Sequence, residues 1–167
     1  MDLPILPFKN FRFVVYFGKS TKPVAAVSKV SALKRTTEVI SHRDGGDNGT
    51  PRHSPGSTKF EPITLERGVT NSREFEEWAN LVYSDETKGT VASPLAGYKR
   101  DITIEVRNIS GQPVVKYTVR NAWVSEYVAL PDLDANANAV ALEHVVIQNE
   151  GWERQTSPDP KPAELDA

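Results

Sequence analysis

The sequence lacks several features on which common functions depend. It contains no cysteine among its 167 residues, which excludes disulfide bonds and thiolate metal sites. Its net charge of -2 argues against a general nucleic-acid-binding protein, because such a protein needs a basic face for phosphates. No apolar run approaches the roughly 20 residues of a membrane span, and the N-terminus has no signal-sequence pattern. We therefore expect a protein that is made and folds in the cytoplasm, without a membrane anchor.

Histidines are scarce, and they form no recognisable site. The chain has three of them: His42, His53 and His144. His42 and His53 flank Asp44 and Asp47, but this spacing fits no zinc-binding pattern. Residues 44–49 resemble a calcium loop, yet Gly46 occupies a position that needs an oxygen ligand. We therefore predict no metal site and interpret His42 and His53 as exposed loop residues.

Motifs of catalysis and nucleotide binding are also missing. There is no G-x-S-x-G nucleophile elbow, and the glycines of residues 45–49 precede neither a lysine nor a helix of a phosphate-binding loop. Glu74, Glu76 and Glu77 cluster near the start of a predicted helix, where the helix dipole favours acidic residues, and we interpret them as its solvated face. We predict no catalytic residue and no cofactor, and hence that the protein is not an enzyme.

A strand, a turn and a helix are predicted over residues 56–83. Residues 59–66 read as a strand, and residues 67–71 contain turn-forming residues. Asn71 or Ser72 is suited to the N-cap of a helix of about three turns. Its apolar stripe is Phe75, Trp78 and Val82, which we expect to pack against the rest of the protein because so short a helix is marginal alone.

The remaining pattern predicts a mainly β protein. Further strands are expected at residues 8–17, 24–31, 33–41, 102–107, 115–120, 121–130 and 139–148. Trp123 is expected to anchor the strand at 121–130, and a helix over 135–143 stays open because alanines dominate there. The fold class is an antiparallel β-barrel or sandwich of about seven or eight strands with one flanking α-helix. We assign residues 1–152 to this single domain and residues 153–167 to a flexible proline-rich tail.

Residues 43–57 read as a long loop. The segment holds four glycines and two prolines and no larger apolar residue. Ordering its backbone costs about 1–2 kcal/mol per residue, and no hydrophobic burial offsets that cost. We therefore interpret it as an arm that orders only against a partner. The candidate contact residues are Arg43, Asp44, Gly45, Gly46, Asp47, Asn48, Arg52 and His53.

The hairpin at residues 102–120 has one apolar and one charged face. On the charged face Glu105 is placed to pair with Lys116 or Arg120 across the strands, each pair adding only about 0.2–1 kcal/mol. The simplest interpretation is a solvated face. In a ring or tube the same face would suit the wall of a water-filled channel.

A series of short motifs follows in order along the chain: FRFVV at 11–15, HRDGGD at 42–47, PGSTKF at 55–60, ITLERGVT at 63–70, NAW at 121–123, PDLDA at 131–135 and VALE at 140–143. In their order and spacing they resemble the tail tube protein family of contractile phages and phage-tail-like contractile injection systems. Phe75, Trp78, Glu150 and Gly151 extend the resemblance, which covers about residues 8–152. Val124 departs from the family, which commonly has proline there, and residues 25–33 follow its pattern loosely.

The resemblance implies a β-barrel or sandwich with one helix, shared with the haemolysin-coregulated protein of type VI secretion. It implies a homo-hexamer whose rings stack into an inner tube, with residues 43–57 as the ring-stacking loop. The implied partners are a contractile sheath protein, baseplate and cap proteins, and DNA or a protein effector as cargo in the channel. The particle would assemble in the cytoplasm and be released outside the cell.

Two alternatives remain open. A tube-initiating or baseplate subunit of the same particle would carry the same motifs. A monomeric carbohydrate-binding β-domain would instead use exposed aromatic residues such as Tyr98, Tyr127 and Trp152.

Overall fold

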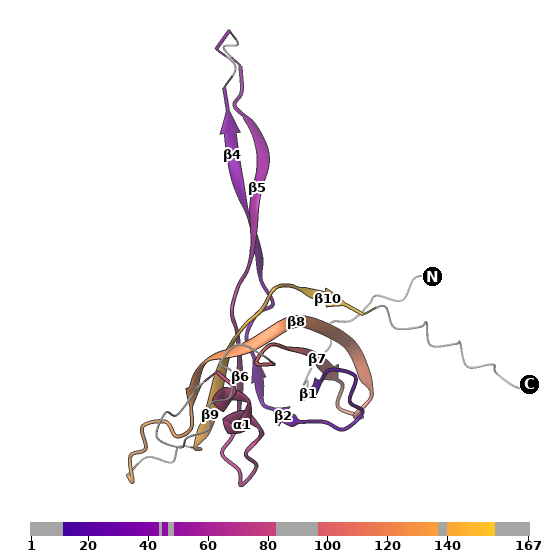
Figure 1. The fold of residues 1–167 in the computed structure, drawn as a ribbon, viewed down its shortest axis with the longest axis vertical. Helices are drawn as coiled ribbons and strands as arrows, with labels where there is room; N and C mark the ends of the chain where they lie inside the picture. The colour runs from indigo at the N-terminus through magenta and orange to yellow at the C-terminus, as the bar shows by residue number, and fades with distance from the viewer. Residues whose placement is uncertain (1–11, 44, 47–48, 83–96, 137–139, 156–167) are drawn as a thin grey trace, which may run out of the picture.

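Antiparallel strands make up most of the computed structural model (Figure 1), which describes residues 12–43, 45–46, 49–82, 97–136 and 140–155. The elements in these ranges are β1 (Arg12–Phe17), β2 (Ala25–Val27), β3 (Lys29–Val30), β4 (Arg35–His42), β5 (Arg52–Phe60), β6 (Ile63–Gly68), α1 (Glu74–Asn80), β7 (Arg100–Arg107), β8 (Pro113–Val128), β9 (Leu142–Gln148) and β10 (Trp152–Arg154). The mainly β fold class with one flanking helix is therefore confirmed.

The main sheet closes on itself through one short segment. Its strand order is β2-β1-β7-β8-β9-β6-β3, with β10 also paired to β8. The two terminal strands, β2 and β3, are consecutive pieces of chain separated only by Ser28. The Ser28 N–H and hydroxyl both donate to the Glu66 carbonyl of β6, at 2.8 Å and 3.1 Å. Residues 25–30 thus join β1 to β6 and close the barrel, which removes sheet edges that would otherwise stay unpaired.

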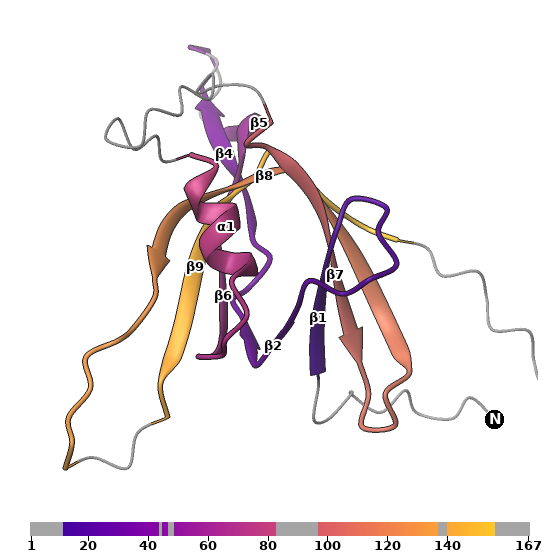
Figure 2. The same cartoon turned by 60° about the horizontal axis from the view of Figure 1, so that its bottom comes forward.

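The core lies inside this closed sheet and under α1. Strand β6 alternates between buried and half-buried residues, and β9 does the same, as expected for strands with one face on the core. Phe75 is fully buried and Trp78 is 1% exposed, and the Trp78 ring meets Phe17 edge-on with centroids 5.1 Å apart. Burying Phe75 and Trp78 stabilises the fold by about 1.5–3 kcal/mol each. Figure 2 shows α1 lying against the sheet beside β6 and β9.

The helix is shorter than predicted. It ends at Asn80 and spans seven residues, about two turns. The N-cap position is Arg73, which makes no side-chain capping bond, so the predicted N-cap at Asn71 or Ser72 was wrong. Val82 was also wrong as a packing residue, because it follows the helix and is 39% exposed. Val82 falls on the predicted stripe only if the helix runs one turn further.

Several boundaries of the later strands differ from the prediction. The strands expected at 115–120 and 121–130 form the single strand β8, in which Trp123 is half-buried and meets Tyr98 edge-on. Residues 142–148 form β9, so the helix alternative is wrong for residues 142–143, while residues 137–139 lie outside the described ranges. The tail was predicted to begin at residue 153, but Glu153 and Arg154 pair with β8 as part of β10. The rest of the tail from residue 156 lies outside the described residues.

Candidate functional site: the arm and its anchor

Strands β4 and β5 form a two-stranded ribbon that projects from the barrel (Figure 1). Their antiparallel register runs from Arg35 opposite Phe60 at the base to His42 opposite Arg52 near the tip, with an irregularity after Thr37. We call residues 35–60 the arm. The predicted loop at 43–57 was therefore wrong for residues 52–57, which are part of β5. Pairing with β4 supplies the backbone hydrogen bonds that a glycine- and proline-rich segment cannot make locally.

The arm has almost no apolar interior. Every residue of β4 is exposed, including Val39 at 65% and Ile40 at 41%. Polar side chains bridge the strands instead: Thr37 to Thr58 at 2.9 Å, Ser41 to His53 at 3.1 Å, and His42 to Ser54 at 3.1 Å. An isolated two-stranded ribbon is at best marginally stable in water, and the arm lacks the apolar face that would stabilise it against the barrel.

The candidate contact residues of the arm divide between strand and turn. Arg52 and His53 lie on β5, whereas Arg43, Gly45 and Gly46 lie in the exposed turn between the strands. The other candidates, Asp44, Asp47 and Asn48, lie outside the described residues.

An aromatic stack anchors the base of the arm to the barrel. Phe60 meets Trp152 of β10 edge-on at 6.1 Å, and Trp152 meets Tyr117 of β8 at 5.9 Å. The Glu61 carbonyl accepts a hydrogen bond of 3.2 Å from the Asn149 side chain. The sequence prediction missed this anchor, although Phe60 is the first large apolar residue after a long polar run. These contacts hold the base of the arm in a fixed place on the barrel.

A buried charge network ties the chain before α1 to the sheet. Arg67 of β6 and Glu143 of β9 are directly opposite each other, 5% and 4% exposed, and the Arg67 Nε donates to the Glu143 carboxylate. Arg67 also donates to the Ser72 carbonyl at 3.0 Å and lies 4.2 Å from the centroid of the Phe75 ring. The Tyr127 hydroxyl donates to Glu143 at 3.1 Å, and burial followed by the nearby carboxylate raises the pKa of Tyr127. These contacts fix where the chain enters α1.

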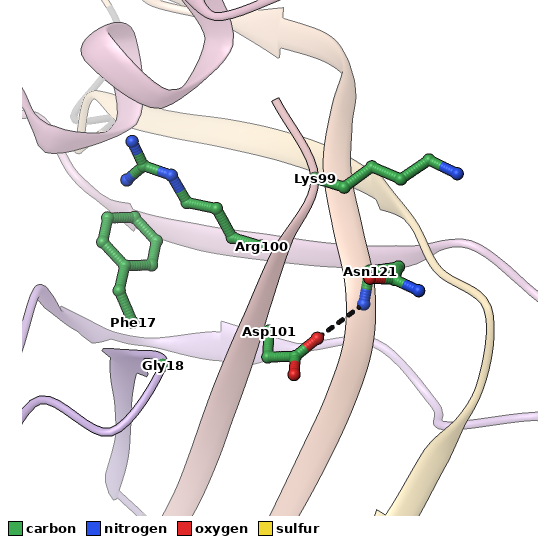
Figure 3. Close-up of a pocket in the computed structure, with 6 residues that line it drawn as sticks. All are labelled: Phe17, Gly18, Lys99, Arg100, Asp101 and Asn121. Carbon is green, nitrogen blue, oxygen red and sulfur yellow. Dashed lines mark hydrogen bonds between the residues drawn. The ribbon is translucent and has the colours of Figure 1, made fainter. Parts of the chain in front are cut away.

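Strand β8 bends at Asn121 as it passes from β7 to β9. Asn121 has a φ of +48°, a conformation that asparagine tolerates better than most residues. Its N–H donates to the Asp101 carboxylate at 2.9 Å, the bond drawn in Figure 3. Its amide donates to Glu150 at 2.6 Å, and Lys99 pairs with the same carboxylate at 2.5 Å. These hydrogen bonds, that from Lys99 first, lower the pKa of Glu150.

The surface depression at this bend has no reactive arrangement. It is lined by Phe17, Gly18, Lys99, Arg100, Asp101 and Asn121 (Figure 3). The Arg100 guanidinium lies over the Phe17 ring, 4.8 Å from its centroid. The charged side chains that line the depression, Lys99, Arg100 and Asp101, therefore each have a partner within the chain, as expected where they hold a bend in place.

The charged face of the β7–β8 hairpin is only partly solvated. Glu105 is 3% exposed and lies between Arg107 at 2.5 Å and Lys116 at 3.1 Å. Arg107 also donates to the Tyr16 hydroxyl at 2.7 Å. Burial raises the pKa of Glu105, but the hydrogen bonds and charges of Arg107 and Lys116 outweigh it, and the pKa lies below its usual value. Arg120 pairs with Glu153 instead, at 2.6 Å.

The described residues contain no cluster of histidine and acidic side chains that could hold a metal ion. No helix within the described ranges is long and apolar enough to cross a membrane. The aromatic residues expected for sugar binding, Tyr98, Tyr127 and Trp152, are half-buried, and each contacts another protein side chain. They do not form an open stacking platform.

The described residues thus form a closed antiparallel β-barrel with one flanking helix and a long exposed arm. The chain belongs to the family of T4-like virus tail tube protein gp19, which matches residues 9–153. This confirms the resemblance found in the sequence. No curated protein matches the chain.

Solved structures of contractile injection systems contain similar chains. A chain in the cryo-EM structure of the anti-feeding prophage cap, which terminates the tube, is 26% identical with a TM-score of 0.72, over 94% of this chain and 97% of that chain. A chain in the sheath–tube complex of the extracellular contractile injection system PVC is 25% identical with a TM-score of 0.70, over 92% and 95%. A type six secretion system protein shares the fold at 10% identity and a TM-score of 0.54, over 87% and 83%.

Proposed function

We propose that the chain is a structural subunit of the inner tube of a contractile injection system or phage tail. Six copies form a ring, rings stack into a tube, and the tube is a channel for DNA or a protein effector. The main support for this proposal is the arm. Every residue of β4 is exposed, and polar side chains join the two strands of the arm, as expected of a segment that a partner covers. Membership of the tail tube family supports it.

The proposed partners are a contractile sheath around the tube, a baseplate at one end and a cap at the other. Similar chains in sheath–tube, baseplate and cap structures support these partners. The particle assembles in the cytoplasm and acts outside the cell. The subunit works by assembly and is not an enzyme.

A tube-initiating subunit is the second candidate. A chain in the anti-feeding prophage baseplate is 24% identical with a TM-score of 0.68, close to the values for the cap and sheath–tube chains. An initiator meets its own copies within a ring but a different protein on one face, and so forms rings without long tubes.

Electron microscopy over a concentration series, with mass measured in solution, tests the proposal. Six-fold rings that stack into tubes are the expected result, and isolated rings would favour the initiator. A monomer at every concentration would overturn both. A variant in which residues 36–59 are replaced by Asn-Gly, a two-residue hairpin turn, should keep the thermal midpoint of the barrel and form no tubes.

A further inference from the structure

A charged groove lies over β1, β7 and β8, on the side of the sheet that faces away from the core. Its volume is about 540 Å³. Residues of β7 alternate across the sheet, so that Ile102 and Ile104 are buried in the core while Thr103 and Glu105 line the groove. The charged residues that line it are Lys19, Glu105, Arg107 and Lys116.

The groove has an excess of positive charge. Its three cations and one carboxylate give a net charge of +2. Beyond the groove, the charges that the strands place on this side of the sheet cancel one another; they are Arg12, Asp101, Arg120 and Glu153. The groove therefore favours an occupant with a net negative charge.

The cations of the groove keep unused hydrogen-bond donors. Arg107 donates from Nε to Glu105 and from Nη2 to the Tyr16 hydroxyl, and no described residue accepts from its Nη1. The Lys116 ammonium pairs with Glu105, and the Lys19 ammonium pairs with no described residue. The side chains of Arg107 and Lys116 are 35% and 43% exposed, so their remaining donors are open to an incoming carboxylate.

Strand β10 leads the chain to the edge of this groove. Gln155, which lines it, donates from its N–H to the Lys116 carbonyl at 2.8 Å and from its side chain to the Thr118 hydroxyl at 2.6 Å. Residues 156–167 follow and lie outside the described residues. These twelve residues reach about 40 Å when extended, whereas the path from β10 across β8 and β7 to β1 is roughly 15 Å.

The sequence of residues 156–167 suits the groove. Pro158, Pro160 and Pro162 lack a backbone N–H, so they cannot prolong the pairing of β10 with β8. Closely spaced prolines also favour an extended conformation, which lowers the entropy lost on binding. The charged residues of the segment give a net charge of -2, opposite to that of the groove; they are Asp159, Lys161, Glu164 and Asp166.

We propose that residues 156–167 fold back over the groove of the same chain. The prolines carry the segment across β8 and β7, and its carboxylates accept from the open donors of Lys19, Arg107 and Lys116. The contact covers a charged face and holds β10, whose Trp152 packs against Phe60 at the base of the arm. It forms within one chain and does not rest on the tube function, so the two proposals stand or fall separately.

Engineered cysteines test the contact, because the chain has no thiol of its own. Thr21 lines the groove, and Ala163 lies in the segment. In the unassembled subunit, with its mass checked in solution, mild oxidation of the variant with Thr21→Cys and Ala163→Cys should give an intramolecular disulfide, seen as a faster band on a non-reducing gel. It should form about tenfold faster than in the control with Thr36→Cys and Ala163→Cys. Thr36 is exposed at the base of the arm, near β10 but outside the groove.

The charge of the segment should set this rate. Adding Asp159→Asn, Glu164→Gln and Asp166→Asn should slow the closure of the Thr21→Cys pair to the rate of the control. Equal rates in the two pairs, or closure that is insensitive to these three substitutions, would overturn the proposal. Disulfide-linked dimers as the main product would mean that the segment binds a second copy, which also overturns a contact within one chain.

Proteolysis gives an independent readout. A glutamate-specific protease cleaves after Glu164, and loss of residues 165–167 is followed by mass spectrometry. Lys19→Glu should speed this cleavage about fivefold, because the covered segment opens more often. Lys22→Glu is the matched control, since Lys22 is also exposed and makes the same charge change but does not line the groove. An unchanged rate in Lys19→Glu, or an equal increase in both variants, would contradict the assigned contact.

Discussion

The barrel and the arm are both built from antiparallel strands, but the barrel buries one face of its strands whereas every residue of β4 in the arm is exposed. In the barrel, the sheet closes on itself, and its buried charges, Arg67, Glu105 and Glu143, have partners within the chain. In the arm, the strands are held by exposed hydroxyl and imidazole groups, and Val39 and Ile40 face solvent. The barrel therefore contains the buried contacts that stabilise the fold, and the arm, under the proposed function, contributes to assembly instead. Substitutions in the barrel should lower stability, and substitutions in the arm should affect assembly.

The largest effect on stability is expected at the buried ion pair. Glu143→Ala removes the buried carboxylate that pairs with Arg67 and leaves the guanidinium only the more exposed Glu74 carboxylate, 3.6 Å away, so the free energy of unfolding should fall by up to about 3–5 kcal/mol. Urea denaturation measures the change. Glu126→Ala is the matched control, because that carboxylate is 62% exposed and its loss should change stability by less than about 1 kcal/mol. Equal losses in the two variants would show that the network does not hold α1 to the sheet.

A pH-dependent effect is expected at Glu105. The folded-state pKa of this carboxylate lies below its usual value, so its stabilisation is present above the unfolded-state pKa and is lost as pH falls through the folded-state pKa. Glu105→Gln should cost about 1.5–3 kcal/mol at pH 7, and the difference from the unsubstituted protein should shrink toward pH 3. Unfolding measured from pH 7 to pH 3 checks this. A difference that is constant with pH would mean that the loss of side-chain charge is not its cause.

A smaller loss is expected at Gly151, which links β9 to β10. Its φ is +136°, and an added Cβ would lie 2.8 Å from the Arg120 Nη2. Gly151→Ala should therefore destabilise the barrel by about 1–3 kcal/mol, seen as a lower thermal midpoint. Gly68→Ala has no heavy atom within 4 Å of its added Cβ and serves as the control. Adding Arg120→Ala should relieve the contact but not the backbone strain, and full recovery would show that strain is negligible.

The sequence predicted the parts of the fold that depend on local periodicity. Alternation placed Ile102 and Ile104 on the buried face of β7, and helical spacing identified Phe75 and Trp78. The sequence also contains a signal that the prediction did not use: Arg67 continues the alternation of buried residues that Ile63 and Leu65 begin in β6. A charge on a core-facing position requires a buried partner, and that partner is Glu143.

The prediction from sequence missed those parts of the structure that depend on pairing between residues far apart along the chain. Residues 52–57 are rich in turn-forming types, yet they form a strand because β4 lies opposite them. Glu105 was expected to be solvated, but it is buried between Arg107 of β7 and Lys116 of β8. Neither neighbourhood can be read from spacing along the chain. The sequence located the arm near residues 43–57 but did not indicate its length or its anchor at Phe60. Near α1, it also did not indicate that Val82 lies outside the packing stripe.

The smallest effect on stability is expected at Ile40, where the comparison between arm and barrel is most direct. Ile40→Ser removes a side chain that is already 41% exposed, so the free energy of unfolding of the barrel should change by less than about 0.5 kcal/mol. Under the proposed function, tube formation should nevertheless be weakened, because the arm loses an exposed apolar side chain that a neighbouring copy would cover. Ile109→Ser removes a more exposed side chain, at 65%, and should change neither property. If Ile40→Ser lowered the thermal midpoint of the unassembled subunit as much as Gly151→Ala does, the arm would belong to the folding unit, and the separation of folding from assembly would fail.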